Sequence, residues 1–541
     1  MIMKSALLSK RKVIAALVFA AMSQAPLSFG QDTDALKDEL AANIDGRAKL
    51  VQEMVDSIFS FAEPGFQEFE TSAYITGILA ENGFEIEMGI SGIPTAWTAT
   101  WSNGDGPTIA LGSDIDALLG LSQLPGSPEI QPMIPGAPGH GEGHNSGMPA
   151  MVAAALAVQD LMVEHDIPGK LMLWPGVAEE LLATKAYFVR DGIFDDVDAN
   201  IFSHVGRDLN TSWGTTGGNG MVSVEYTFHG KTAHGAGAPW AGRSALDAVE
   251  VMNYAWNMRR EHLPLTQRSH YIISNGGGQP NIVPDLASVW YYFREQTFES
   301  VRELFETGNT ISEAAAMATE TTVERRILGY AAPQHGNKPM AEAAYENIKK
   351  VGLPRWSEED IQFARAVQQR NTTSFVDYMG GAESPLVTEL GELSTPETRG
   401  PAMGGGSDDI GDIMWTVPTI TIRYPSNVPN TTGHHVTSAM AMATPIAHKG
   451  AVTGAKAVGM TVLDLLLDPT LIPSAKDYFE NVQLNGTSYA PVLSESDMPA
   501  IDLNTEIMSQ MRPQMREYYY DPSRYDSYLE QLGIDYPPVG Q

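Results

Sequence analysis

The stretch GMPAMVAAALAVQDLMVEHDIPGKLMLWPG, residues 147–176, shows the pattern that decides the fold. It begins with a small, apolar run of helical length and ends with KLMLWPG, a short apolar run typical of a buried strand. TIALGSDID, residues 108–116, is a similar strand earlier in the chain. Helical runs and buried strands alternate in this way from residue 32 to about residue 216. This alternation predicts an α/β domain with a mostly parallel sheet flanked by helices on both faces.

A second pattern interrupts the first over residues 217–330. The runs MVSVEYTFHG, SHYIISNGG, ASVWYYFRE and TTVERRILGY are typical of strands, and helical runs lie after the first and before the last of them. The order β-α-β-β-α-β predicts a ferredoxin-like α+β unit. We therefore expect an α/β domain of residues 31–216 and 331–541 with a small domain inserted. The charged, poorly patterned segment 356–400 predicts an embellishment or a long loop.

Length and charge limit the possible functions. A chain of 541 residues is too long for one ordinary core, which agrees with two domains. A formal net charge of -32 argues against binding nucleic acid or an anionic membrane through a basic surface. The sequence contains no cysteine, so no disulfide stabilises the fold.

The first 30 residues have the pattern of a secretory signal peptide. Four basic residues precede the apolar run VIAALVFAA, residues 13–21, which is too short to span a bilayer. Small residues at Ser28 and Gly30 predict that the mature chain begins at Gln31. No other run has the pattern of a membrane span, so we expect an exported, periplasmic protein. The alternative is a cytoplasmic protein with an apolar first helix.

The loop GHGEGHNSG, residues 139–147, is the first candidate functional site. Glu142 and His144 lie two residues apart in a glycine-rich segment, so both side chains can point to one side of an extended backbone. Imidazole and carboxylate are the ligands that zinc, manganese and cobalt use in proteins. The alternative is a flexible turn with incidental polar residues.

Three further segments place acids or histidines after predicted strands. Glu179 and Glu180 are adjacent in PGVAEELLATK, His204 ends the run DANIFSHVG, and His434 and His435 follow VPTITIRYP. Taken singly, each has an ordinary alternative: an acidic pair at a helix start, a loop histidine, and a helix cap. Because strand ends meet at one edge of a sheet, the segments together predict one site.

This site has enough ligands for two divalent metal ions, and one carboxylate to spare. A free carboxylate beside a metal-bound water is a general base, which is the role that the pattern leaves for Glu179. Asp114 and Asp116, in LGSDIDALLGLSQ, are either further ligands or groups that orient a ligand histidine from behind. Their alternative is a solvated turn. The five candidate ligands are Glu142, His144, Glu180, His204 and His434.

Several widely spaced strings together resemble one family. They are DALLGLSQ, GHGEGHN, VRDGIFDDVDA, GRSALDAV, PNIVPDLA, DIGDIMWTVP and IAHKG, in this order. The chain resembles the dinuclear metal amidohydrolases and metallopeptidases that include aminoacylases, auxin-conjugate hydrolases and aminobenzoyl-glutamate hydrolases. It is most similar to the B-subunit type of the last group, over nearly the whole mature chain.

The resemblance implies roles for particular residues. It implies two metal ions, zinc, manganese or cobalt, on the five candidate ligands, with Glu179 as the base and Asp114 and Asp116 in support. It implies that the inserted domain is a lid that also forms a homodimer. His234, in GKTAHGAGAP, would reach an active site, often the partner's, to stabilise the oxyanion. Asn281, in GQPNIVPD, and Arg294, in YYFREQ, would hold the substrate near its carboxylate.

The chain departs from the family pattern at one ligand position. Glu142 stands where the subfamily usually has Cys, so a harder oxygen replaces a soft thiolate and changes the expected metal preference and substrate range. In an exported protein, this exchange avoids an oxidisable ligand. Asp114 stands where more distant relatives have a ligand histidine, which the closest subfamily also lacks.

The expected function is metal-dependent hydrolysis of the amide bond of small N-acyl or N-aroyl amino acids or dipeptides. A lid and a carboxylate-binding pair suit such substrates better than long peptides, which need an open cleft. The alternative is an exported binding protein on the same fold that has lost catalysis.

Overall fold

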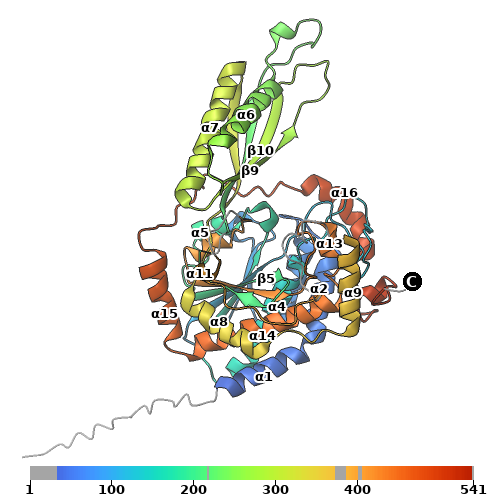
Figure 1. Cartoon of the computed structure of the whole chain (residues 1–541), viewed down its shortest axis with the longest axis vertical. Coiled ribbons are helices and arrows are strands. Elements are labelled where there is room, and N and C mark those ends of the chain that lie inside the picture. Colours follow the sequence, from blue (N-terminus) through green and yellow to red (C-terminus); the bar gives the residue numbers. More distant parts are fainter. Residues whose placement is uncertain (1–32, 216–217, 372–384, 400–404, 539–541) are drawn as a thin grey trace, which may run out of the picture.

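The structure is a computed structural model that describes residues 33–215, 218–371, 385–399 and 405–538. The predicted signal peptide, residues 1–30, lies outside the described residues. The chain forms a large α/β domain and a smaller lid that projects from it (Figure 1).

A seven-stranded sheet forms the centre of the large domain. Its four central strands, β4, β3, β5 and β13, run parallel, and the strands at both sides pair antiparallel. Glycine at position 112 lets β3 pass the indole ring of Trp174, because a Cβ there would lie 2.1 Å from that ring. In sheet order the strands are β1 (Glu85–Met88), β2 (Trp97–Ser102), β4 (Lys170–Gly176), β3 (Thr108–Asp114), β5 (Ala199–Gly206), β13 (Thr419–Pro425) and β6 (Asn210–Thr211).

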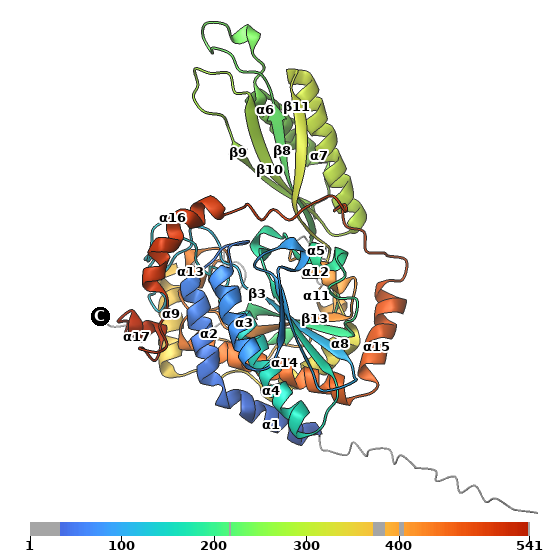
Figure 2. The same ribbon diagram turned by 180° about the vertical axis from the view of Figure 1, so that it is seen from behind.

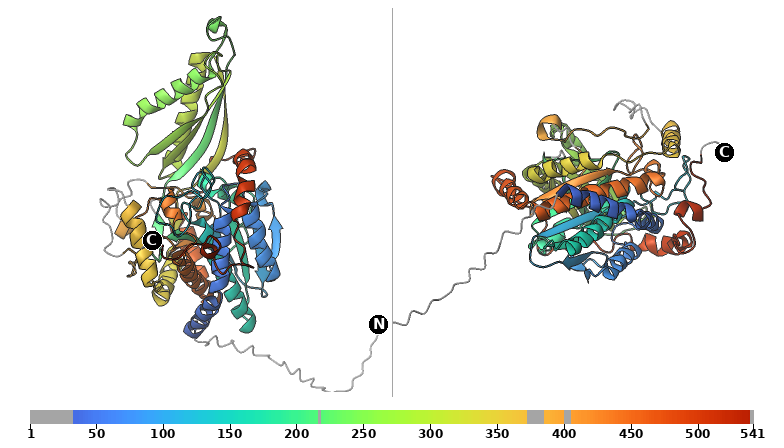
Figure 3. Two further views of the ribbon diagram at one scale, coloured as in Figure 1. Left: turned by 90° about the vertical axis from the view of Figure 1, so that its right-hand side faces the viewer. Right: turned by 90° about the horizontal axis from the view of Figure 1, so that it is seen from below.

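Two long helices, α4 (Gly147–Glu164) and α14 (Pro445–Leu467), pack against each other and against the sheet. Both are long and apolar enough to cross a membrane, but 83% and 72% of the residues in their apolar windows are buried, as in core helices. Shorter helices complete the layers that Figure 3 shows from below. They are α1 (Thr33–Gly46), α2 (Ala48–Phe61), α3 (Phe69–Glu81), α5 (Lys185–Arg190), α8 (Lys338–Val351), α12 (Ile410–Met414), α13 (Val436–Ala439), α15 (Leu471–Tyr478), α16 (Thr505–Met515) and α17 (Tyr528–Gln531).

Part of segment 356–400, where the sequence predicted an embellishment or long loop, is a regular helix. This helix, α9 (Glu358–Asn371), begins with a reciprocal pair in which Asp360 N donates to Ser357 Oγ and Ser357 N donates to Asp360 Oδ2. The string SEED indicates this helix start in the sequence, because it places Ser357 three residues before Asp360. A short helix, α11 (Pro396–Arg399), ends the segment, and residues 372–384 lie outside the described residues.

The lid follows the predicted order β-α-β-β-α-β. Its elements are β8 (Gly220–His229), α6 (Ala245–Arg259), β9 (Arg268–Asn275), β10 (Leu286–Glu295), α7 (Phe298–Thr319) and β11 (Thr322–Ala331). Alternate residues of β8, such as Val224 and Tyr226, are buried with residues of α6 and α7 in the lid core. The four strands form one antiparallel sheet in the order β11-β8-β10-β9, so β9 is an edge strand. Figure 3 shows this sheet from the side.

Two connections fix the base of the lid to the large domain. The chain enters and leaves the lid through the paired short strands β7 (Gly214–Thr215) and β12 (His335–Gly336). Residues 484–504, which we call the C-terminal strap, then cross beneath the lid between α15 and α16 (Figure 2). Arg302 of α7 donates hydrogen bonds to two strap carbonyl groups, and Arg326 of β11 forms an ion pair with Asp502 of the strap.

Candidate metal centre

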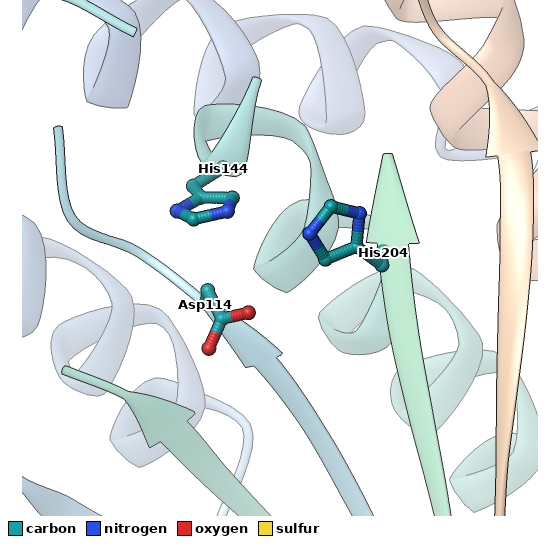
Figure 4. Close-up of side chains that lie close together, drawn as sticks. All are labelled: Asp114, His144 and His204. Atoms are coloured by element: carbon teal, nitrogen blue, oxygen red, sulfur yellow. The ribbon is translucent and has the colours of Figure 1, made fainter. Parts of the chain in front are cut away.

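The candidate ligand segments meet at the carboxyl ends of the parallel strands. β5 carries His204 near its end, the turn after β4 carries residues 179–180, and the loop after β13 carries His434. Residues 142–144 come from the loop that leads into α4. Figure 4 shows His144 and His204 close together, with Asp114 beside them at the end of β3.

Glu142 lies at the centre of the cluster. Its Oε1 is 3.6 Å from His204 Nε2, and its Oε2 is 2.9 Å from His434 Nε2 and 4.0 Å from His144 Nε2. Glu180 contacts the same group, with Oε1 4.0 Å from His144 Nδ1 and Oε2 3.6 Å from His434 Nε2. The structure therefore brings together all five side chains that the sequence indicated as ligands.

A buried nitrogen without a partner shows that this cluster fits metal ions. Among the described residues, His144 Nε2 has no hydrogen bond, although Glu142 and Glu179 carboxylate oxygens lie 4.0 and 3.9 Å away. Ligands that share a metal at about 2.0–2.3 Å lie about 3–4 Å from one another, as His144 Nε2 and the Glu142 carboxylate do. Imidazole and carboxylate donors fit zinc, manganese or cobalt, and the five clustered side chains would hold such ions.

His204 presents its Nε2 to Glu142, whose Oε1 lies 3.6 Å away. Its Nδ1 lies 2.8 Å from the Val205 carbonyl oxygen, an acceptor, and also faces the Arg423 guanidinium, a donor. Burial and the guanidinium of Arg423, whose Nη1 is 2.9 Å from Nδ1, lower the pKa of His204 to about 4. The imidazole is therefore neutral near pH 7.

Strained backbone positions bracket the turn that carries the two glutamates. The residues before and after the 3-10 turn Glu179–Leu181, Ala178 and Leu182, have φ angles of 52° and 51°, in the left-handed region that side chains disfavour. The buried carboxylate of Glu68 accepts a hydrogen bond of 2.8 Å from Ala178 N and supports this conformation. Strain held in place by such contacts is common where side chains must be aimed accurately.

Glu179 lies between the candidate ligand His144, 3.9 Å from its Oε2, and a second group of acids. Its carboxylate shares a space with those of Asp114 and Asp408, whose nearest oxygens lie within 4.8 Å of one another. Burial, and then the charges of Asp114 and Asp408, raise the pKa of Glu179 well above its usual range. A carboxylate with a raised pKa can both take and return a proton near neutral pH.

The two aspartates after β3 have different surroundings. Asp116 accepts hydrogen bonds from His144 Nδ1 at 3.3 Å and from Glu180 N at 3.0 Å, so it contacts two candidate ligands from behind. Asp114 instead accepts a hydrogen bond of 2.7 Å from the buried ammonium group of Lys185. Asp116 is therefore placed to orient a ligand histidine, and Asp114 to balance a buried cation.

Lys185, Asp408 and Asp409 were not identified from the sequence. The Nζ atom of Lys185 contacts Asp409 Oδ1 and lies 3.9 Å from Asp408 Oδ1. Asp409 Oδ2 also accepts hydrogen bonds from Thr184 N and Lys185 N at the start of α5. This buried network ties the glutamate turn to the segment 407–412, and its only signal in the sequence was the acidic pair in GSDDIGD.

The substrate residues suggested for the lid lie at its two ends. Arg294 on β10 lines the cavity at the lid base and donates to Ser407 Oγ at 3.3 Å. His234 and Asn281 are exposed at the opposite tip, and their segments are joined by a hydrogen bond of 2.8 Å from Gly235 N to Asn281 O. Neither of these two residues lines the cavity of its own chain.

The ligand cluster opens into a cavity of about 530 Å³ between the large domain and the lid base. One wall consists of the glutamates and histidines described above. The other walls come from strand ends, from the lid base and from residues within 394–399 and 405–408. Side chains on these walls include Asn210, Ser212, Arg294, Gln334, Ser394, Arg399, Ser407, Met414, Thr421 and Arg423.

Comparison with known proteins decides the family. Residues 216–320 match the M20 family described as a peptidase dimerisation domain. The sequence is 31% identical to the B-type subunit of p-aminobenzoyl-glutamate hydrolase from Escherichia coli, over 81% of this chain and 94% of that protein. The chain belongs to the M20 peptidase family. A second relative, Xaa-Arg dipeptidase of Mus musculus, is 26% identical over 84% of this chain and 94% of that protein.

A solved structure shows the same fold. Aminobenzoyl-glutamate utilization protein from Klebsiella pneumoniae superposes with a TM-score of 0.52 at 17% identity, over 81% of this chain and 99% of that chain. The predicted architecture, an α/β domain with an inserted ferredoxin-like lid and dimerisation domain, is therefore confirmed. M20 membership also makes this protein a hydrolase of amide bonds.

Proposed function

We propose that the protein is a dinuclear metal-dependent amidohydrolase that cleaves N-acyl or N-aroyl amino acids or small dipeptides. One observation carries this proposal: Glu179 remains free of the five-ligand cluster while its Oε2 lies 3.9 Å from His144 Nε2. A carboxylate next to a metal cluster, but not part of it, is the arrangement that hydrolytic water activation needs.

The chemistry is divided between the cluster and the spare carboxylate. Two divalent cations on the five ligands would acidify a water molecule and polarise the amide carbonyl group. Glu179 takes a proton from the attacking water and returns it to the leaving amine nitrogen. Only 5% of Glu179 is exposed, so bulk water does not compete for this proton. Arg294 then holds the carboxylate of the substrate at the lid base.

The substrate class follows from the names of the relatives and from the enclosed cavity. The relatives act on p-aminobenzoyl-glutamate and on Xaa-Arg dipeptides, and a third is an indole-3-acetyl-aspartic acid hydrolase of Enterobacter agglomerans. Each name describes an amide of an amino acid. A cavity of about 530 Å³ accommodates a molecule of this size rather than a long peptide.

The lid supports the proposal of a homodimer. Its edge strand β9 exposes Ile272 and Ile273, and its helix α6 exposes Tyr254 and Met258. Apolar side chains at a free strand edge are typical of surfaces that pair with a second chain. A dimer would also give the exposed tip residue His234 a cavity to enter.

Export is part of the proposal. The support is the basic and apolar pattern of the first 30 residues and the absence of cysteine from the sequence. Sequencing of the N-terminus of the mature protein tests it, and we expect Gln31. A mature protein that retains its first residues would contradict export by this route.

The central test combines metal removal with one substitution. Chelation is expected to abolish hydrolysis of N-acyl amino acids, and Glu179→Gln to lower kcat by about 10²–10⁴-fold because the proton acceptor is lost. Metal content, measured by elemental analysis, should persist in Glu179→Gln. The matched control is Glu359→Gln on the exposed side of α9, which should keep full activity.

Two outcomes would contradict the proposal. Full activity after thorough metal removal would exclude a metal-dependent hydrolase. Less than one metal ion per chain, together with no hydrolysis of any N-acyl amino acid, would favour a binding protein that has lost catalysis.

A further inference from the structure

Three arginines line the cavity, and none forms an ion pair with a carboxylate in the part of the chain that the structure describes. Arg294 donates to Ser407 Oγ and Arg399 to Trp213 O, and Arg423 contacts both Val205 O and His204 Nδ1. All three are half-buried. This is unusual in a chain with 66 acidic and 34 basic residues, where many arginines could find an acidic partner.

An unpaired cation that is partly removed from water costs free energy unless an anion compensates it. Burial lowers the pKa of both Arg294 and Arg399, which reflects this cost. The Nε atom of Arg294 is buried and makes no hydrogen bond among the described residues. The cavity therefore presents three guanidinium groups that have no carboxylate partner among the described residues.

The three arginines lie in two separate places. Arg294 comes from the lid base. Arg423 and Arg399 flank the short edge segment 210–213: Arg423 pairs in register with Asn210, and Arg399 binds the carbonyl group of residue 213. A ligand that fills the cavity would therefore place one anionic group near Arg294 at the lid base. It would place a second anionic group near Arg399 and Arg423 at the sheet edge.

The charge of the lining supports an anionic ligand. Its carboxylates, Glu142, Glu179, Glu180 and Asp408, are on the wall of the candidate metal centre. Four carboxylates and three guanidinium groups nearly balance, so two bound divalent cations would leave the lining with a net positive charge.

The described lining has few large apolar side chains. Leu182 and Met414 are the only ones among the described lining residues, and the only rings there are the imidazoles of His204 and His434. Pockets for aromatic groups are usually lined by apolar and aromatic side chains. The lining therefore favours a small polar ligand over one with a large ring.

We infer that the substrate carries two anionic groups, and that Arg399, supported by Arg423, binds the second while Arg294 binds the carboxylate next to the scissile amide. This inference rests on the proposed amide hydrolysis and names its substrate class. The substrate is a small N-acyl amino acid with an extra carboxylate, either on the side chain of the amino acid or on the acyl group.

The first experiment compares matched substrates with the metal-loaded protein. N-acetylglutamate and N-acetylglutamine test the side-chain position, and N-succinylalanine and its terminal amide test the acyl position. We expect one dicarboxylate to exceed its neutral partner in kcat/KM by about tenfold or more, because charged hydrogen bonds are worth about 1.5–3 kcal/mol. Equal rates within both pairs would overturn the inference.

The second experiment assigns the effect to Arg399. Arg399→Gln should bring the ratio of dicarboxylate to neutral substrate close to one, mainly through KM. The matched control is Arg365→Gln, which makes the same charge change on the exposed side of α9 and should keep the wild-type ratio. An unchanged ratio in Arg399→Gln would contradict the assignment.

A binding measurement separates this inference from the proposed function. Calorimetric titration of glutamate and glutamine into the metal-loaded protein, and of glutarate as a plain dianion, requires no turnover. If no amide is hydrolysed, the proposed function fails, yet tighter binding of glutamate and glutarate to wild type than to Arg399→Gln still supports the second anion site. Equal binding to both proteins overturns it.

Discussion

The two ends of the lid differ in how they relate to their own chain. The base carries Arg294 into the cavity, and Ala332, just beyond β11, donates to the buried carboxylate of Asp412. The tip carries His234 and Asn281, which are exposed and line no part of that cavity. One end therefore completes the site of its own chain, while the other is available to act on a second chain.

The surroundings explain this difference. At the base, Tyr489 of the C-terminal strap packs on Phe298 and donates to Asp412 at 2.7 Å. At the tip, Trp240 is 76% exposed and Ile282 is 49% exposed. A base held by the rest of the chain suits a role in binding substrate in the same chain. An exposed apolar tip suits contact with a partner chain.

The largest effect is expected at the tip. His234→Ala should lower kcat by about 10²–10³-fold if this imidazole donates to the developing oxyanion, the usual cost of losing one such donor. Steady-state kinetics on an N-acyl amino acid measures it. Wild-type kcat in His234→Ala would show that the tip takes no part in catalysis.

Mixing the two variant chains then decides where the tip acts. When His234→Ala and Glu179→Gln chains are combined, each mixed dimer contains one site with both residues intact if the tip enters the partner's cavity. Activity should then return to a measurable fraction of wild type. A mixture that stays as inactive as its two components would place the histidine in the cavity of its own chain.

A smaller effect is expected at the base. Arg294→Ala should lower kcat/KM by about 10–100-fold, mainly through KM, because one charged hydrogen-bonding partner of the substrate carboxylate is lost. The matched control, Arg325→Ala, removes an exposed arginine from β11 of the same sheet and should change little. If both variants bind substrate equally well, the base does not hold the carboxylate.

The smallest effect concerns stability rather than rate. Asp412→Ala leaves Ala332 N and the Tyr489 hydroxyl group without their partner, which should cost about 1–3 kcal/mol of unfolding free energy. Tyr489→Phe removes one hydroxyl group and should cost about 0.5–1.5 kcal/mol. Denaturant unfolding measures both, and His234→Ala should unfold like wild type. Equal stability of Asp412→Ala and wild type would show that the base needs no such anchor.

Much of the fold could be predicted because its elements carry clear periodicity. The alternating strand residues Val222, Val224 and Tyr226 face the lid core as their period of two requires. The buried runs of β3 and β4 predicted central parallel strands. The helix α9 was missed because its hydrophobic face is weak, although Ser357 and Asp360 marked its start.

The candidate ligands could be predicted because each follows a strand, and strand ends meet. The ion pair between Lys185 and Asp409 could not be predicted, because the sequence does not distinguish a buried ion pair from two solvated charges. Arg423 had a faint signal as a lone cation within the apolar strand TITIRYP. No sequence signal indicated Arg399, because its position beside residue 213 depends on a long connection that has no periodic pattern.

The C-terminal strap has a consequence for how this protein matures. Synthesis proceeds from the N-terminus, so the lid and both halves of the large domain's sheet emerge before residues 484–504 do. Until then Arg302 and Arg326 have no strap to bind, and the tilt of the lid is unconstrained on that side. The contacts that fix the lid base are therefore completed late, when one of the last-made segments passes beneath the lid.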